Sequence, residues 1–216
     1  MKKYFLGLFL LIGLAILSSC GQSNLSDITQ QFVGPQVSVD EIPDEPSKVT
    51  LIDDIKGTNA NEIEVLLANN FYMLDVVQGD NGNANIYATR RFTIEELASV
   101  LTETIKPQQI SDVKDNQQIL IYPDHFVTLK SSEEDPDVLL IEVASDEFVR
   151  NNYSPNFLST YFAIRLLDNV LGVNDWGKKR MNQCSNGGCY GGYSVGGSIP
   201  KRGMTDFRGG GPSAGK

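Results

Sequence analysis

The sequence predicts a single small α+β domain, with three helices on a mostly antiparallel sheet of five or six strands and with disordered ends. Three observations lead to this prediction. Short runs rich in β-branched and aromatic residues alternate with turn residues, as in antiparallel strands. Separate stretches carry the apolar spacing and capping residues of helices. Both ends lack a sustained apolar period, so the domain is expected over residues 48–172.

The first 19 residues have the layout of a secretory signal peptide. Lys2 and Lys3 precede a stretch from Tyr4 to Leu17 that carries no charge. The following Leu17-Ser18-Ser19-Cys20 resembles the lipobox of bacterial lipoproteins, which implies cleavage before Cys20 and a diacylglycerol on its thiol. The alternative is an uncleaved membrane helix, although a span needs about 20 apolar residues. We therefore expect a lipid-anchored protein on the extracytoplasmic face of the cell membrane.

Residues 20–47 are predicted to form a flexible tether between the lipid and the domain. Pro35, Pro43 and Pro46 and several acidic residues interrupt any regular period. A coil of this length would hold the domain on the order of 30 Å from the lipid.

The first part of the domain is predicted to contain a strand, a helix and a β-hairpin. We expect a short strand over residues 48–55 and a helix over 61–70. Strands are then expected over 71–77 and 84–92, because Asn81-Gly82 between them tolerates the positive φ angles of a hairpin turn.

The clearest helix signal in the chain begins at Thr93. Thr93 and Glu96 have the spacing of a capping box, an apolar stripe follows through Ile105, and Pro107 ends the helix. Three further strands are predicted after it, over residues 118–122, 126–130 and 138–144.

A third helix is predicted after Ser154, which serves as its cap, with Pro155 at the first helical position and Gly172 as its end. The helix is apolar over more than half of its circumference but contains Arg165 and Asp168, and it is too short to span a membrane. We expect it to pack across the sheet, with contact to a partner or a lipid surface as the alternative.

Residues 173–216 are predicted to be a disordered basic tail, because their glycine-rich composition buries little apolar surface. Cys184 and Cys189 lie within this tail. In an oxidising compartment their spacing favours a disulfide, while free thiols or half of a zinc site are the alternatives.

Charge is distributed unevenly along the chain. The formal net charge is −9, whereas residues 177–216 carry seven Lys and Arg residues against Asp206 and amount to +6. With Lys2 and Lys3 also set aside, residues 20–176 amount to −17. No nucleic-acid partner is expected for such an acidic body, while the tail would be attracted to anionic lipid or anionic wall polymer.

One run resembles a known family. Arg150-Asn151-Asn152-Tyr153-Ser154-Pro155 is similar to a motif of uncharacterised lipoproteins of low-GC Gram-positive bacteria, catalogued as a domain of unknown function. Residues 71–77, the helix from Thr93 and the Gly/Tyr-rich tail fit the same pattern, so the resemblance covers about residues 62–172 and the lipobox. It implies a lipid-anchored α+β domain with a variable tail, and it implies no catalytic residue.

The residues assemble no recognisable catalytic set, cofactor site or metal site. His125 is the single histidine and is expected in a solvated turn, and the acids of residues 133–137 are expected in a solvated loop. The best candidate site is formed by Arg150, Asn151, Asn152 and Tyr153. These residues would either bind an anion or small ligand at a helix N-terminus or tie the last strand to the helix.

These observations favour a non-enzymatic interaction module at the cell envelope. Its expected partners are the membrane through the lipid on Cys20, an anionic surface through the tail, and a protein. The alternatives are an envelope protein that binds a small ligand or anion and an envelope hydrolase that uses His125 and nearby carboxylates.

Overall fold

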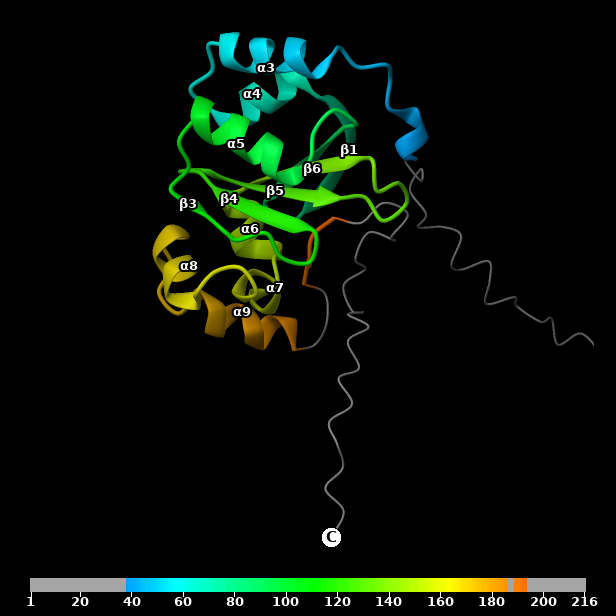
Figure 1. Ribbon diagram of the computed structural model, residues 1–216. Coiled ribbons are helices and arrows are strands. Elements are labelled where there is room, and N and C mark those ends of the chain that lie inside the picture. The colour runs from blue at the N-terminus through cyan, green and yellow to red at the C-terminus, as the bar shows by residue number, and fades with distance from the viewer. Residues whose placement is uncertain (1–37, 186–188, 194–216) are drawn as a thin grey trace, which may run out of the picture. The chain divides into compact units, whose positions relative to one another are not determined.

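The computed structural model describes residues 38–185 and 189–193, and the structural statements below concern these residues (Figure 1). The predicted signal peptide, Cys20, the first part of the predicted tether and residues 194–216 lie outside the described residues.

A six-stranded sheet with antiparallel neighbours forms the centre of the domain, in the order β1-β2-β6-β5-β4-β3 (Figure 1). The predicted α+β class with five or six antiparallel strands is therefore confirmed. The central strand β6 joins the β1–β2 hairpin to the β4–β5 hairpin. The bounds are β1 (Tyr72–Gly79), β2 (Gly82–Thr89), β3 (Gln109–Ile110), β4 (Gln117–Ile121), β5 (His125–Ser131) and β6 (Leu139–Ser145).

The turn between β1 and β2 has the predicted backbone conformation. Asn81 has φ 57° and Gly82 has φ 134°, so both residues take the positive φ angles that the sequence suggested. Gly79 pairs with Gly82, which leaves Asp80 and Asn81 as the two loop residues.

Three helices cover one face of the sheet (Figure 1), and Thr93 and Glu96 form the predicted capping box of the third. The apolar layer beneath them is formed by residues such as Leu66, Leu97 and Leu101 from the helices and Tyr87, Val127 and Ile141 from the sheet. The helices are α3 (Lys48–Gly57), α4 (Ile63–Asn70) and α5 (Ile94–Thr104).

The prediction of a strand over residues 48–55 was wrong, because this segment forms α3. The side chain of Ser47 accepts a hydrogen bond from the backbone N–H of Thr50 and thereby caps the helix. Leu51 and Ile55, four residues apart, are its buried residues. The cap and this spacing outweigh the short apolar run on which the strand prediction depended.

Four short helices occupy the other face (Figure 1), so the described residues contain seven α-helices where three were predicted. The predicted long helix after Ser154 is broken into two pieces, with Ala163 in an extended conformation between them. The break lets Leu158, Phe162 and Leu167 all reach the core, which a straight helix could not achieve with so wide an apolar surface. The helices are α6 (Asp146–Asn152), α7 (Pro155–Ser159), α8 (Ile164–Val170) and α9 (Trp176–Cys184).

The prediction that disorder begins at residue 173 was also wrong. Trp176 opens α9 and is 2% exposed, and Tyr190 is 4% exposed. The glycine-rich composition predicted that the conformational entropy lost on ordering would keep this segment disordered. Burial of these large side chains offsets that loss. Residues 189–193 follow the helix and are called the strap below.

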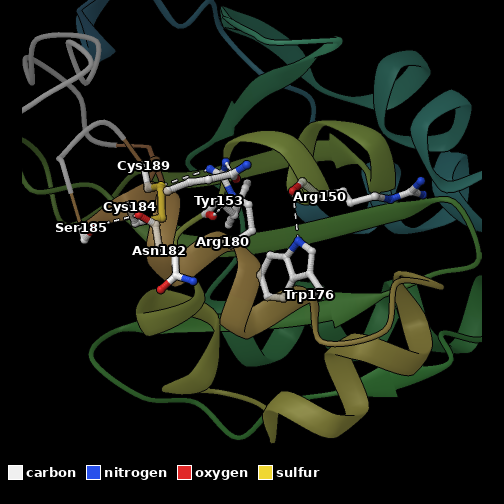
Figure 2. Close-up of a disulfide and its surroundings, with 9 residues drawn as sticks. Arg150, Tyr153, Trp176, Arg180, Asn182, Cys184, Ser185 and Cys189 are labelled. Atoms are coloured by element: carbon white, nitrogen blue, oxygen red, sulfur yellow. Dashed lines mark hydrogen bonds between the residues drawn. A yellow bond between two sulfur atoms is a disulfide. The ribbon is translucent and has the colours of Figure 1, made fainter.

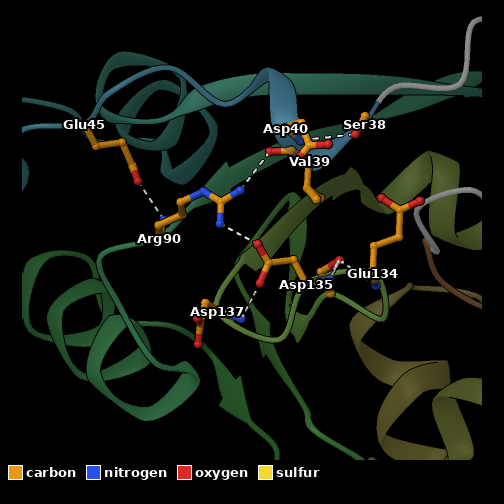
Figure 3. A network of polar contacts seen from close by, with 9 residues as sticks. Ser38, Val39, Asp40, Glu45, Arg90, Glu134, Asp135 and Asp137 are labelled. Carbon is orange, nitrogen blue, oxygen red and sulfur yellow. Dashed lines mark hydrogen bonds and ion pairs between the residues drawn. The ribbon is translucent and has the colours of Figure 1, made fainter.

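The end of the predicted tether is likewise ordered (Figure 3). Val39 lies in the short 3₁₀ helix η2 (Val39–Glu41) and is 4% exposed. The Arg90 guanidinium donates to the carbonyl oxygen of Val39 (3.2 Å) and pairs with Asp135 (2.5 Å), while the backbone N–H of Arg90 donates to Glu45 (2.6 Å). These contacts fix residues 38–45, so a flexible tether would have to end before Ser38.

Within residues 38–185 and 189–193, none of the helices has both the length and the apolar character that a membrane crossing requires.

Candidate functional site

A glutamate occupies a core position at the centre of the sheet. Glu142 lies on β6, opposite Ile86 of β2 and Thr128 of β5, and is 2% exposed. Its strand neighbours Leu140 and Ala144 point into the apolar layer beneath α6–α9, and strand alternation places Glu142 on that same face. A carboxylate in such a position is costly unless it is hydrogen-bonded.

Groups from the candidate motif and the strap surround this carboxylate. The Tyr153 hydroxyl donates to Oε1 of Glu142 (2.7 Å), and the backbone N–H of Tyr193 donates to Oε2 (3.1 Å). The Tyr190 hydroxyl is buried beside the same group, outside ordinary hydrogen-bond geometry, and it interacts electrostatically with Glu142. Burial raises the pKa of the Glu142 carboxyl, and the Tyr153 hydrogen bond is the largest opposing effect.

The tyrosines respond to the same burial. Desolvation, followed by the nearby charge of Glu142, holds the pKa values of Tyr153 and Tyr190 well above the ordinary value of 10.0. Burial also raises the pKa of Tyr193, with the charge of Asp75 as the next cause. The three phenols therefore remain protonated at neutral pH and can donate hydrogen bonds.

The strap is attached to the candidate motif through its backbone. The N–H of Tyr190 donates to the carbonyl oxygen of Asn152 (2.7 Å), and the N–H of Ser154 donates to the carbonyl oxygen of Tyr190 (2.7 Å). At the far end of the strap, the Tyr193 hydroxyl donates to Asp75 of β1 (3.0 Å), and Lys130 donates to the Tyr193 carbonyl oxygen (3.4 Å). Together with the bond from Tyr193 to Glu142 of β6, these contacts connect the motif to three strands of the sheet.

Aromatic rings fill the space between the motif and the strap. The ring centroids of Tyr153 and Tyr190 are 5.1 Å apart, and those of Phe148 and Tyr190 are 5.5 Å apart, both in edge-to-face geometry. Such pairs contribute about 0.5–1.5 kcal/mol each beyond area burial.

A disulfide closes the start of the strap (Figure 2). Cys184, the last residue of α9, is bonded to Cys189, and their Cα atoms are 5.3 Å apart. Arg180, one turn before Cys184 on α9, contacts this bond through its side chain. Its Nη2 donates to Sγ of Cys189 (3.1 Å) and its Nε donates to the carbonyl oxygen of Tyr153 (3.3 Å). Burial lowers the pKa of this guanidinium from its ordinary value, and the charge of Asp80 opposes that effect.

Three of the four residues of the candidate motif, namely Arg150, Asn152 and Tyr153, make side-chain hydrogen bonds or ion pairs within the domain. Arg150 pairs with Asp146 one turn earlier, and its carbonyl oxygen accepts a hydrogen bond from Nε1 of Trp176 (3.0 Å; Figure 2). Asn152 accepts from the backbone N–H of Asp80 (2.9 Å) and donates to its carbonyl oxygen (3.0 Å). Asn151 is partly buried in the last turn of α6.

These contacts favour the structural alternative for the motif. The helix that follows it, α7, has only five residues, and the N–H of its cap residue Ser154 is used by the strap. The motif therefore forms a socket, defined as residues 150–154, that receives the strap and joins it to α6 and the β1–β2 hairpin.

The groups considered for hydrolysis do not come together. His125 is partly buried at the start of β5, where its Nε2 lies 3.1 Å from a carboxylate oxygen of Glu64 on α4. This pair lies on the face opposite to Glu142. An open surface hollow of about 310 Å³, lined by Lys56, Glu103 and Thr104, also lies on the α3–α5 side.

The described part of the chain contains no preformed cluster of side chains that could bind a metal cation. Residues 38–185 and 189–193 contain no group of three or more His, Cys, Asp or Glu side chains that could hold a metal ion. In the acidic loop, Glu133 pairs with Lys130 and Asp135 pairs with Arg90.

Comparison with protein families identifies the domain. A family model described as a domain of unknown function (DUF4247) matches residues 49–216. The chain belongs to the DUF4247 family. The predicted membership in a family of unknown function is confirmed, and the DUF4247 match includes Glu142, the socket and the strap. Comparisons with curated proteins and with solved structures give no match.

Sequence reasoning missed Glu142, although one signal was present. The run from Val138 to Ala144 contains a single charged residue among apolar ones, and such a residue on a central strand must be buried. Arg180 and Trp176 of this DUF4247 chain were missed because they lie in the segment assigned to the disordered tail. A lone tryptophan beside a predicted domain end was the available signal.

Proposed function

We propose that this DUF4247 chain is a membrane-anchored lipoprotein on the extracytoplasmic face, and that its domain is a non-enzymatic interaction module. The domain would hold its basic C-terminal tail, now defined as residues 194–216, close to anionic phosphate groups at the cell envelope. The lipobox-like residues up to Cys20 motivate the anchor. The charge of residues 194–216, four cations against Asp206, motivates the anionic target.

The attachment of the strap is the observation that carries this proposal. The tail begins directly after Tyr193, whose N–H binds Glu142, whose hydroxyl binds Asp75 and whose carbonyl oxygen accepts from Lys130. The buried carboxylate of Glu142 at the centre of the sheet binds both this segment and Tyr153 of the socket. Such an attachment is expected if the position and direction of the tail matter.

The N-terminal segment is attached on the same side of the sheet. Val39 and Ile42 belong to the apolar cluster that also contains Tyr190 and Tyr193. The segment leading back to Cys20 and the segment leading into the tail therefore join the same layer of the domain. This arrangement supports a tail that works close to the anchored membrane.

Vesicle binding tests the role of the tail. The full chain is compared with a variant in which Lys201, Arg202, Arg208 and Lys216 are changed to Gln, so that any lipid anchor is common to both. Wild type should prefer vesicles containing anionic lipid over zwitterionic ones, by about 1 kcal/mol per cation at low salt, and added salt should reduce the preference. An equal preference in both proteins would refute the proposal.

Two further measurements complete this test. Competition with soluble polyphosphate separates lipid headgroups from a phosphate polymer as the anionic source. Mass spectrometry of the mature protein should find an acylated Cys20 at the N-terminus, and an intact leader would rule out the anchor.

We also propose a protein partner, for which β1, an edge strand of the sheet that the described residues form, is the best candidate. Edge strand β1 exposes Tyr72, Met73 and Val76 by 37%, 47% and 39%. An exposed apolar edge is suited to pairing with an extended segment of another protein. A photo-crosslinker at Met73 should capture one defined partner in intact cells, whereas the same group at the exposed Lys106 should not. Equal capture at both positions would remove this proposal.

The two alternative functions receive less support. An anion or small ligand at Arg150 and Asn152 would have to displace the contacts that these side chains already make with Asp146 and with the backbone of Asp80. A hydrolase would need His125 beside further catalytic groups, and its contact is Glu64 on the surface of α4.

A further inference from the structure

The two sulfur atoms of the disulfide lie in different environments. Cys189 is 6% exposed, whereas Cys184 at the end of α9 is only partly buried. Nη2 of Arg180 lies 3.1 Å from Sγ of Cys189 (Figure 2). A neighbouring guanidinium favours a thiolate, and a sulfur that is stable as a thiolate is the better leaving group in disulfide exchange.

We propose that Cys184–Cys189 is a thiol–disulfide exchange site for an external dithiol, and that its reduction releases the strap from the socket and from Glu142.

The exchange follows from this asymmetry. A thiolate of the dithiol attacks Sγ of Cys184, which belongs to the more exposed of the two residues, and forms a mixed disulfide. The bond between the two cysteines breaks, and its electron pair leaves on Sγ of Cys189 as a thiolate beside Arg180. The second thiol of the dithiol loses its proton and attacks the reagent's sulfur in the mixed disulfide. Cys184 leaves as a thiolate and takes up a proton, so two electrons pass to the protein and the dithiol becomes a disulfide.

The same guanidinium connects the sulfur to the socket. Arg180 also donates through Nε to the carbonyl oxygen of Tyr153 (3.3 Å), the residue whose hydroxyl binds Glu142. A change of charge at Cys189 therefore acts on a group that contacts the socket directly. A disulfide serving only stability would gain nothing from a cation that stabilises its reduced form.

Release of the strap follows from the short loop that the disulfide closes. The bond joins residues five apart in sequence, and it limits the conformations open to an undocked strap. Without it, the strap depends on two backbone hydrogen bonds to the socket and on the contacts of Tyr190 and Tyr193. Reduction should increase the undocked population on the order of tenfold.

Two measurements on the full chain test the proposal. In the first, the disulfide is reduced with dithiothreitol, and alkylation with mass spectrometry follows the rate. Arg180→Gln should slow reduction about tenfold, because the leaving thiolate loses its cation, while Arg180→Lys should retain most of the wild-type rate. Equal rates for wild type and Arg180→Gln would overturn the exchange mechanism.

The second measurement needs no variant. Hydrogen exchange of the wild-type chain is compared before and after reduction. The amides of Ser154, Tyr190 and Tyr193 should exchange about tenfold faster in the reduced protein, while those of β5 and β6 should not change. Unchanged exchange at the strap, or equal acceleration throughout the sheet, would overturn release. Both measurements are made without lipid, so their failure is distinct from a failure of the vesicle experiment.

Discussion

The hydroxyl of Tyr153 donates a 2.7 Å hydrogen bond to Oε1 of Glu142 and thereby joins the socket to the central strand of the sheet. The Tyr193 N–H binds the other oxygen of the same carboxylate. One buried side chain thus links the predicted motif with a segment 40 residues later in sequence.

Tyr153→Phe should destabilise the domain by about 1–3 kcal/mol, because it leaves a buried carboxylate without its strongest donor. Urea denaturation of the full chain, followed by circular dichroism, measures this difference in free energy of unfolding. Tyr161→Phe is the matched control, since that hydroxyl makes only a 3.4 Å contact with the carbonyl oxygen of Lys114. Equal losses in the two variants would show that the Glu142 contact has no special weight.

Glu142→Gln should remove one component of the pH dependence of stability. Burial raises the native pKa of Glu142 above the ordinary value of 4.5, so the folded state keeps the proton to higher pH than the unfolded chain does. Stability should therefore fall as pH rises from about 4.5 through the raised native pKa, and then remain lower. The Gln variant, which has no proton to lose at this position, should lack this decline.

The comparison isolates Glu142 from other carboxyl groups. Hydrogen bonds from Lys48 and Arg90 lower the pKa values of Glu96 and Asp135, so the stability from these pairs is lost at lower pH, as pH falls through their native values. Glu147→Gln on the exposed surface of α6 serves as control. Parallel stability curves for wild type and Glu142→Gln between pH 4.5 and 8 would contradict a raised pKa.

Local sequence signals identified the elements whose determinants are local. The capping box of Thr93 and Glu96 and the turn at Asn81-Gly82 depend on neighbouring residues, and both were predicted. The disulfide pairing was favoured on its spacing, and the structure contains that bond. The arrangement around Glu142 depends on contacts between β6, α6 and a segment that composition marked as disordered. Nothing local in the sequence shows that Tyr190 will be buried beside Tyr153.

Gly79→Ala should destabilise the domain by about 1–3 kcal/mol through overpacking. A Cβ at this position would lie 2.6 Å from atoms of Asn152 and Phe148, and the Asn152 side chain cannot retreat without losing its bonds to Asp80. Thermal denaturation measures the loss. Gly57→Ala is the control, because a Cβ there meets nothing within 4 Å and should stabilise α3 by about 0.4–1 kcal/mol. A neutral Gly79→Ala would mean that the hairpin and α6 are less closely packed than described.

Arg90→Gln should release the N-terminal segment while the sheet stays folded. The Arg90 guanidinium holds both Asp135 and the carbonyl oxygen of Val39, and a neutral amide cannot replace both contacts (Figure 3). Limited proteolysis should cut the variant several-fold faster within residues 38–47, with circular dichroism unchanged. Arg165→Gln, on the exposed side of α8, is the control and should be cut as slowly as wild type.

The same contact predicts an effect of acid on the wild-type protein. The Arg90 hydrogen bond lowers the pKa of Asp135, so acidification well below the ordinary value of 3.8 should release the same segment. Protection of residues 38–47 in the Arg90→Gln variant would instead assign the docking to burial of Val39 alone.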